Sequence, residues 1–463
     1  MKQMEKFAMV KVGQRFPLTI KRLGINGEGV GFFKKTVVFV PGALPGEEIV
    51  AEVEKVHPKR IEARIQKFRQ KSKDRVDAPC VYYDECGGCQ LQHLAYDAQL
   101  REKRALLLQT LARYTEHDET FWDKLTRPMK GMDDPWSYRN KSQFQVKQVG
   151  RNVLAGLYAE QSHHLIDVER CIVQDPRLDE ITRGVVEIVR DLQISIYDEK
   201  KGGEKGLRTI VVRVGMKSGD AQLTLVTKSG DLPKQDLLLK RVSARFPQVK
   251  SIVHNIQASK GSEVFGEQTQ LLYGTRTIRE EIKEIQYELS ARAFFQLNPS
   301  QTKVLYEEVE RMAQLTGKEK VVDAYSGVGT IGLWLAPHAG EIRGMEVIPD
   351  AVKDANKRVR AEGYSHVSYE VGTAEKVFPK WAKKGFKPDV VVVDPPRIGL
   401  DEEMINTLLK SAPKRIVYVS CNPATLAKNV SDLSQKYKVK EIQPVDMFPQ
   451  TAHVECVALI ELK

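Results

Sequence analysis

The C-terminal third of the chain alternates short apolar, β-branched runs with amphipathic segments, and this alternation restricts the fold more than any other feature. The runs lie at residues 320–324, 341–346, 390–393, 416–419 and 454–461. Strands that alternate with helices predict an α/β domain built on a parallel, Rossmann-like sheet. Ligands bind such sheets beyond the carboxyl ends of the strands, so the residues that follow each run are the candidate site residues.

Two strand ends are suited to an adenosine cofactor. The first run continues into Tyr325-Ser326-Gly327-Val328-Gly329-Thr330, and the second run ends at Glu346, which could accept hydrogen bonds from ribose hydroxyls. A carboxylate that merely ends a strand is the alternative. NAD and S-adenosylmethionine (AdoMet) both fit, whereas the glycines lack the Lys-Ser/Thr of a nucleoside triphosphate P-loop. Asp394-Pro395-Pro396 favours AdoMet, because the two prolines fix the backbone and direct Asp394 into the cleft, as in AdoMet enzymes acting on planar nitrogenous substrates.

Cys421, in Ser420-Cys421-Asn422-Pro423, follows the fourth run and would face the same cleft. A cysteine at a strand end is often only a small apolar residue. The carbon C5 of a pyrimidine, however, becomes nucleophilic once a thiolate adds to C6, and a base must then remove the C5 proton. His453 and Glu455 share one face of the last strand, and we favour Glu455 as that base. An amine methyltransferase would need the Asp-Pro-Pro segment but no cysteine.

The N-terminal residues 8–68 contain five short β-patterned runs with turn signals between them, which predicts a small OB-like barrel. Residues 1–79 hold 17 Lys and Arg against 9 Asp and Glu, so +8 of the net charge of +11 lies there. This asymmetry indicates a nucleic-acid-binding module, with a merely solvated basic face as the alternative. Phe32 and Phe33 are candidates for stacking on bases.

Four cysteines, Cys80, Cys86, Cys89 and the distant Cys171, are sufficient to bind a metal ion or an iron–sulfur cluster. Their spacing favours a cluster over zinc, and unrelated buried thiols are the third alternative. They lie in a predicted α+β central domain, residues 76–265. Within it we expect a helix at 92–115, with Arg101, Lys103 and Arg104 outward, and a flexible loop at 200–206. The last domain spans 266–463.

No apolar run approaches the ~18 residues of a membrane span, and the N-terminus leads into no signal core. We therefore expect a cytoplasmic protein that does not bind membranes. We also expect it to be a monomer.

Five motifs together resemble the RNA uracil-C5 (5-methyluridine) methyltransferase family, in family order and spacing. They are Phe294-Phe295-Gln296-Leu297-Asn298, Asp323 to Thr330, Asp394-Pro395-Pro396-Arg397, Ser420-Cys421-Asn422-Pro423 and Phe448 to Glu455. The N-terminal barrel is similar to the TRAM domain of the same family. The resemblance covers nearly the whole chain.

The resemblance implies an AdoMet-dependent RNA methyltransferase with Cys421 as nucleophile and Glu455 as proton-abstracting base. Gln296, Tyr325, Glu346 and Asp394 would bind AdoMet, and Cys80, Cys86, Cys89 and Cys171 would ligate a [4Fe-4S] cluster. The branch with both a TRAM domain and a cluster mostly modifies large-subunit (23S) ribosomal RNA. Ribosomal RNA is therefore the first expected substrate and transfer RNA the second. Amine methylation of RNA and a non-enzymatic RNA-binding role are the remaining alternatives.

Overall fold

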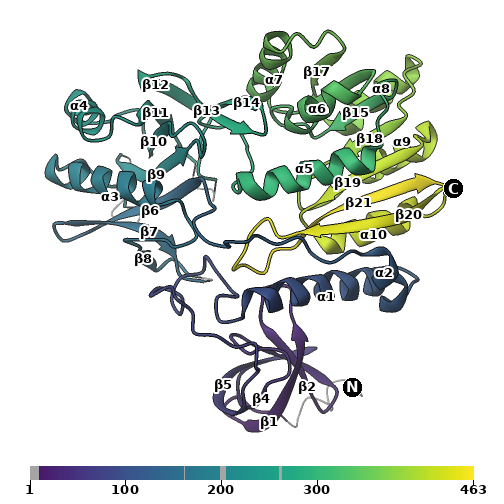
Figure 1. The fold of residues 1–463 in the computed structure, drawn as a ribbon. Coiled ribbons are helices and arrows are strands. Elements are labelled where there is room, and N and C mark those ends of the chain that lie inside the picture. The colour runs from purple at the N-terminus through teal and green to yellow at the C-terminus, as the bar shows by residue number, and fades with distance from the viewer. Residues whose placement is uncertain (1–9, 161, 199–204, 260–262) are drawn as a thin grey trace.

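The computed structural model describes residues 10–160, 162–198, 205–259 and 263–463, and it confirms the predicted multi-domain α/β architecture (Figure 1). A closed barrel near the N-terminus lies below helix α1 (Tyr96–Tyr114), and two seven-stranded sheets lie above it. The predicted barrel start at residue 8 and most of the predicted 200–206 loop lie outside the described residues. No helix in the described ranges is long and apolar enough to cross a membrane.

Five strands close the N-terminal barrel, as predicted. In spatial order they are β1 (Arg15–Leu23), β2 (Gly29–Phe33), β3 (Thr36–Val40), β5 (Arg60–Gln70) and β4 (Glu48–His57). Alternate residues of β1 fill the barrel core, as period-2 geometry requires. Phe33 stacks on Phe16 with ring centroids 3.8 Å apart, whereas Phe32 is 54% exposed. Of the two candidate stacking residues, only Phe32 is thus fully available to a base.

Helix α1 is the helix predicted at 92–115, but the prediction that Lys103 faces outward is wrong. Lys103 is only 2% exposed, because its ammonium pairs with the buried carboxylate of Asp446. Helix α1 packs against α2 (Glu119–Leu125) and against α10 (Pro423–Leu433), and Leu107 and Leu426 share one hydrophobic core. Helices α1 and α2 fall within the range predicted for the central domain, yet they cover the C-terminal sheet.

The central sheet is mainly antiparallel, with α3 (Pro176–Asp191) and α4 (Gln235–Arg245) closing its core. Its strands, in spatial order, are β12 (Gln268–Gly274), β11 (Val249–Ile256), β10 (Ala221–Thr227), β9 (Leu207–Val214), β6 (Lys141–Val149), β7 (Asn152–Tyr158) and β8 (Leu165–Asp167). The predicted boundary at 265/266 precedes β12, whose hydrogen bonds are to β11 of this sheet.

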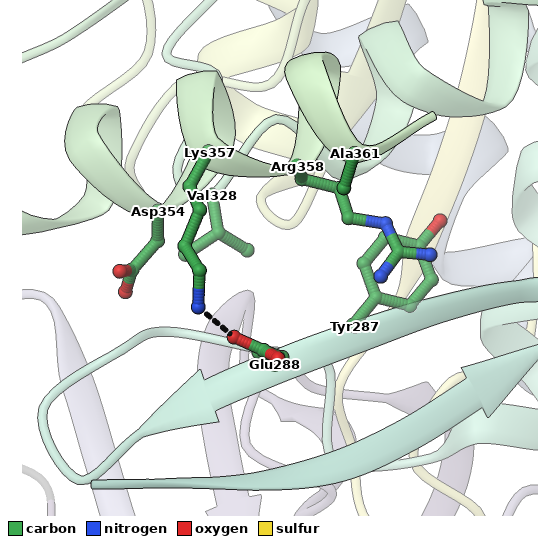
Figure 2. Close-up of a pocket in the computed structure, with 7 residues that line it drawn as sticks. All are labelled: Tyr287, Glu288, Val328, Asp354, Lys357, Arg358 and Ala361. Atoms are coloured by element: carbon green, nitrogen blue, oxygen red, sulfur yellow. Dashed lines mark hydrogen bonds and ion pairs between the residues drawn. The ribbon is translucent and has the colours of Figure 1, made fainter. Parts of the chain in front are cut away.

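A two-stranded hairpin, β13 (Thr277–Ile282) and β14 (Ile285–Ser290), joins the two large sheets and is absent from the sequence prediction. Figure 2 shows β14 beside α7 (Pro349–Ala361), where Lys357 pairs with Glu288 across a small cavity of about 50 Å³. That volume suits one or two water molecules rather than a nucleotide. The docked hairpin directs the following residues, 291–298, towards the carboxyl ends of the next sheet.

The C-terminal sheet is mainly parallel, as predicted, but the last predicted strand, at 454–461, is antiparallel to both of its neighbours. In spatial order the strands are β17 (Val367–Val371), β16 (Glu341–Glu346), β15 (Lys320–Ala324), β18 (Val390–Val393), β19 (Arg415–Ser420), β21 (Glu455–Leu462) and β20 (Tyr437–Val445). Strands β17 and β20 are missing from the sequence prediction. Strand β21 lies between β19 and β20 and is antiparallel to both.

Helices cover both faces of this sheet. Val391 and Val393 face a core shared with α8 (Ala374–Lys383), α9 (Glu402–Ser411) and α10, whereas Val390 and Val392 face α5 (Pro299–Ala313), α6 (Thr330–Leu335) and α7. Burial on both faces explains the uninterrupted valine run of β18.

Candidate active site

Six residues predicted to act or to bind cofactor line one cavity of about 880 Å³ at the carboxyl ends of the parallel strands. They are Gln296, Tyr325, Glu346, Asp394, Cys421 and Glu455. This volume lies in the upper part of the range of small-ligand sites, which is about 300–1,000 Å³. It therefore has room for an adenosine cofactor and a second small group.

The loop after β15 forms the cofactor side of this cavity. Tyr325, Gly327 and Gly329 all have positive φ, at 62°, 56° and 77°. At Gly329 a Cβ atom would lie 2.7 Å from the ring of Tyr369, so this position requires glycine for space as well as for conformation. The tight turn brings the Gly327 amide to Glu346, where the N–H donates to Oε2 over 3.0 Å.

Glu346 ends β16 with its carboxylate fixed by two backbone amides. Gly327 donates to Oε2, and Ile348 donates to Oε1 over 3.0 Å. Each carboxylate oxygen keeps a further lone pair for a hydroxyl donor. Tyr325 also has a fixed orientation, because its hydroxyl donates to Glu375 Oε1 over 2.6 Å.

Gln296 lines the same cavity and lies in the segment that follows β14. Buried Arg213 of the central sheet donates to the Ala293 carbonyl oxygen over 2.7 Å, and the Asn140 amide donates to that of Leu297 over 3.0 Å. Asn298 caps α5 by accepting from Gln301 N over 3.2 Å. The central domain thus positions the segment that carries Gln296. This role of Arg213 was not predicted from the sequence.

Asp394 and Cys421 lie on neighbouring loops that are hydrogen-bonded to each other. The Asn422 side chain donates from Nδ2 to the Arg397 carbonyl oxygen over 2.9 Å and accepts from Ala424 N over 3.1 Å as the N-cap of α10. Burial raises the pKa of Asp394 to about 7. The two loops are therefore one rigid edge of the cavity.

The Cys421 thiol is half-buried, and its pKa is raised to about 11. Burial is the main cause, and the negative charges of Glu455 and Asp394 add to it, while the positive charge of Arg397 opposes it. The other cysteine nearby, Cys456, is fully buried in the sheet core. Of these two thiols, only Cys421 lines the cavity.

Glu455 begins β21 and is 8% exposed at the cavity wall. Burial, followed by the charge of Asp394, raises its pKa to about 8. His453, the other candidate base, has a pKa lowered to about 4 by burial and by Arg397. Arg397 Nη2 donates to His453 Nδ1 over 3.1 Å, which leaves the proton of the neutral ring on Nε2. The geometry therefore favours Glu455 over His453 as a proton acceptor.

The four remaining predicted site residues are Cys80, Cys86 and Cys89, which precede α1, and Cys171, which lies between β8 and α3. The charges of Cys86 and Cys80 contribute to raising the pKa of Cys89, and the charge of Cys89 does the same for Cys171, although burial dominates in both. Within the described residues, however, no group of three or more His, Cys, Asp or Glu side chains is arranged to hold a metal ion. Gly88 N donates to Cys86 Sγ over 3.4 Å, and Cys171 N donates to Asp179 over 2.8 Å. The four predicted ligands are therefore not arranged around one metal-binding centre in this structure.

Two sequence families match the chain. Residues 95–463 match the family described as tRNA (Uracil-5-)-methyltransferase, and residues 9–65 match the TRAM domain. A protein of Halalkalibacterium halodurans named "Uncharacterized RNA methyltransferase" is 55% identical over 98% of this chain and 97% of its own. One of Bacillus anthracis, also named as an RNA methyltransferase, is 51% identical over the full length of both.

A solved structure is similar over almost the whole chain. It is that of the Pyrococcus abyssi tRNA (uracil-54, C5)-methyltransferase in complex with S-adenosyl-L-homocysteine. The TM-score is 0.75 at 29% identity, with 96% of this chain and 100% of the other covered.

Proposed function

The chain belongs to the tRNA (uracil-5-)-methyltransferase family and carries a TRAM domain, and from this membership we propose a uridine methylation at C5 that proceeds through a bond between Cys421 and C6. As a member of this family it is an AdoMet-dependent RNA methyltransferase. The observation that supports the cysteine route most directly is the single cavity that Cys421, Asp394 and Glu455 share.

In this mechanism the flipped uridine enters the cavity and Cys421 Sγ forms a bond to C6. The C5–C6 π electrons form the new bond from C5 to the methyl carbon, whose bond to the sulfonium breaks with both electrons remaining on that sulfur. Glu455 then takes the C5 proton, the C–H electrons restore the C5–C6 double bond, and the C6–Sγ bond breaks to release the thiolate. The positive charge of Arg397 favours the ionised forms of both Cys421 and Glu455.

When bound, AdoMet supplies the electrophilic methyl group. We assign its binding to Gln296, Tyr325, Glu346 and Asp394, which line one cavity and come from four different segments. Glu346 suits ribose hydroxyls, because its fixed carboxylate retains lone pairs after accepting two backbone amides. Asp394 and the rigid Asp-Pro-Pro backbone suit the region where cofactor and base meet.

Large-subunit ribosomal RNA is the first candidate substrate, because the chain combines a basic N-terminal barrel with the four clustered cysteines. Transfer RNA is the second, favoured by the solved neighbour, a tRNA (uracil-54, C5)-methyltransferase. Exposed basic residues on the last barrel strand and beyond it, Lys67, Arg69 and Lys73, with exposed Phe32 suit phosphate contacts and base stacking.

Mapping of 5-methyluridine in RNA from a strain that lacks this protein tests the substrate. We expect the loss of the C5 methyl group at one or a few uridines of large-subunit ribosomal RNA, restored by the wild-type gene and not by one encoding Cys421→Ala. Loss of the C5 methyl group only in transfer RNA would identify transfer RNA as the substrate. Unchanged 5-methyluridine in both RNAs, or a lost methyl group on nitrogen, would contradict the proposal.

We further propose that Cys80, Cys86, Cys89 and Cys171 bind an iron–sulfur cluster that braces the central domain. The support is the donor chemistry: the four thiols come from two segments, and the charges of Cys80 and Cys86 act on Cys89 while that of Cys89 acts on Cys171. The methyl transfer needs no external oxidant or reductant, so a cluster here would be structural.

Anaerobically purified protein is expected to contain about four iron and four sulfide per chain if the cluster is of the [4Fe-4S] type. Cys86→Ser should lower both contents and the melting temperature, because one ligand is lost. Cys421→Ser is the matched control, since it removes a thiol outside the group and should leave iron unchanged. Stoichiometric zinc in place of iron, or full stability of Cys86→Ser, would refute the assignment.

A further inference from the structure

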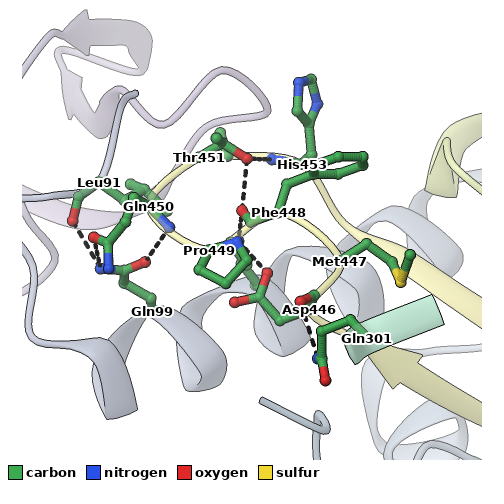
Figure 3. Close-up of polar contacts among 12 residues, drawn as sticks. Leu91, Gln99, Gln301, Asp446, Met447, Phe448, Pro449, Gln450, Thr451 and His453 are labelled. Atoms are coloured by element: carbon green, nitrogen blue, oxygen red, sulfur yellow. Dashed lines mark hydrogen bonds and ion pairs between the residues drawn. The ribbon is translucent and has the colours of Figure 1, made fainter. Parts of the chain in front are cut away.

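The loop at residues 446–454 joins β20 to β21 and leads directly into Glu455. Its contacts come largely from segments that are distant in sequence, above all from helix α1. Figure 3 shows this base-bearing loop, residues 446–454, with Gln99 and Leu91 on one side and Gln301 on the other. The contacts that hold the loop therefore also fix the start of β21 and the position of the Glu455 carboxylate.

A buried ion pair fixes the start of the base-bearing loop. Lys103 Nζ of α1 lies 2.6 Å from Asp446 Oδ1, and both side chains are almost fully buried, at 1% and 0% exposure. The same ammonium donates to the Phe448 carbonyl oxygen over 3.1 Å. Tyr96, about two helical turns earlier in α1, donates its hydroxyl to Asp446 Oδ2 over 2.9 Å. One ammonium thus joins two positions of the loop to α1.

A second contact fixes the middle of the loop, where Gln450 has a positive φ of 70°. Gln99 Oε1 accepts from Gln450 N over 3.1 Å, and Gln99 Nε2 donates to Gln450 Oε1 over 2.9 Å. The Gln450 carbonyl oxygen accepts from the amides of Gln90 and Leu91, each over 3.0 Å. A non-glycine residue in this conformation is held by its surroundings, and here the surroundings are α1 and the residues just before it.

A buried ion pair adds little net stability, because desolvation of both charges offsets their attraction. Removal of one partner is costly, since the other charge is left buried and unpaired. Such a pair is suited to fixing one geometry rather than to stabilising the fold. Here the geometry that it fixes is that of the loop before the proposed base.

We propose that Lys103, together with Gln99, is a positioning residue for Glu455, holding the base-bearing loop where the carboxylate reaches the C5 proton. The inference rests on the proposed function, in which Glu455 acts only after methyl transfer. A displaced Glu455 would therefore slow proton removal and release of Cys421 while leaving the preceding attack and methyl transfer nearly intact. A role confined to stability would not separate these steps.

Charge effects accompany the geometry. The groups that act on Glu455 are Asp394, Arg397, Asp446 and Lys103, and Glu455 in turn acts on Cys421. Lys103 lowers the pKa of Glu455 whereas Asp446 raises it, so a variant that neutralises both changes the net charge near the base very little. An effect of that variant on proton removal therefore reports the position of Glu455 rather than the net charge around it.

The test is a single-turnover experiment with ordinary uridine RNA, AdoMet and the double variant Lys103→Met/Asp446→Asn. Rapid quenching measures methyl incorporation and, on denaturing gels, the protein–RNA adduct. We expect methyl incorporation within about threefold of wild type, and release of the adduct slowed by at least about tenfold, since small misplacements of a catalytic group are costly. Arg101→Met, at an exposed position of the same helix, is the control and should release RNA at the wild-type rate.

Equal slowing of both steps, or release at the wild-type rate in a folded double variant, would overturn the inference. If the double variant does not fold, the same experiment is performed with Gln99→Met. This variant removes the contacts to Gln450 without leaving a buried charge. Failure of the wild-type protein to methylate C5 would instead count against the proposed function, and the two failures are therefore distinguishable.

Discussion

Replacement of Cys421 by alanine is expected to reduce methyl transfer by on the order of 10⁴-fold or more, the scale of loss seen when covalent enzymes lose their nucleophile. Without sulfur addition at C6, C5 has no electron pair to offer the methyl group, so binding alone cannot sustain the reaction. Incorporation of a radiolabelled methyl group into RNA measures the rate. Binding of AdoMet and RNA by calorimetry should change little, because Asp394, Glu346 and the barrel are untouched.

Cys456→Ala is the matched control for this experiment. Cys456 lies opposite Ser420 in the antiparallel register of β19 and β21, but it is fully buried and faces the core. Its loss should cost about 1 kcal/mol of stability and leave the methylation rate close to wild type. A Cys421→Ala enzyme that still methylates at a comparable rate would exclude the covalent route.

The wild-type rate should also rise with pH between about 7 and 9. The thiolate of Cys421 attacks, and burial and the charges of Glu455 and Asp394 raise the pKa of this thiol to about 11. The base must be ionised to accept a proton, and burial raises the pKa of Glu455 to about 8. Both reactive forms therefore increase as pH rises through this window.

Glu455→Gln is expected to lower steady-state turnover by roughly 10²–10⁴-fold, the usual contribution of a positioned general base. The amide has a similar size but cannot accept the C5 proton, so the reaction should stop after methyl transfer. The enzyme should then accumulate bound to ordinary RNA through Cys421, with a methyl group on C5. Denaturing gels and mass spectrometry of the complex detect this species.

His453→Asn serves as the comparison for the base. His453 receives a hydrogen bond from Arg397 at Nδ1, which leaves Nε2 protonated and unable to act as the acceptor. This variant should not accumulate the adduct. Accumulation with His453→Asn and full turnover by Glu455→Gln would reverse the assignment of the base.

The strand ends could be predicted from sequence because parallel strands place their carboxyl ends along one edge. Glu346, Asp394 and Cys421 each follow a recognisable apolar run, and all three line the same cavity. Burial on both faces makes these runs continuous, and that pattern is local. Local patterns were therefore sufficient for this part of the site.

The residues that hold the site in place could not be predicted, because they act through contacts between segments that are distant in sequence. Lys103 falls at a position of the predicted helix that looks solvent-facing, and its partner Asp446 is 343 residues away. Arg213 similarly acts on a segment 80 residues away. Strand β20 and the β13–β14 hairpin were missed because mixed polar and apolar residues conceal their pairing.

RNA that contains 5-fluorouridine is the sharpest test of a bond between Cys421 and C6, because a base cannot remove fluorine from C5 as it removes a proton. With AdoMet and this RNA, the wild-type protein is expected to form a complex that survives denaturation, with the nucleotide attached to the peptide that contains Cys421. No such complex should form with Cys421→Ala. A wild-type enzyme that methylates ordinary RNA but never forms the complex, or a complex that persists in Cys421→Ala, would contradict the account.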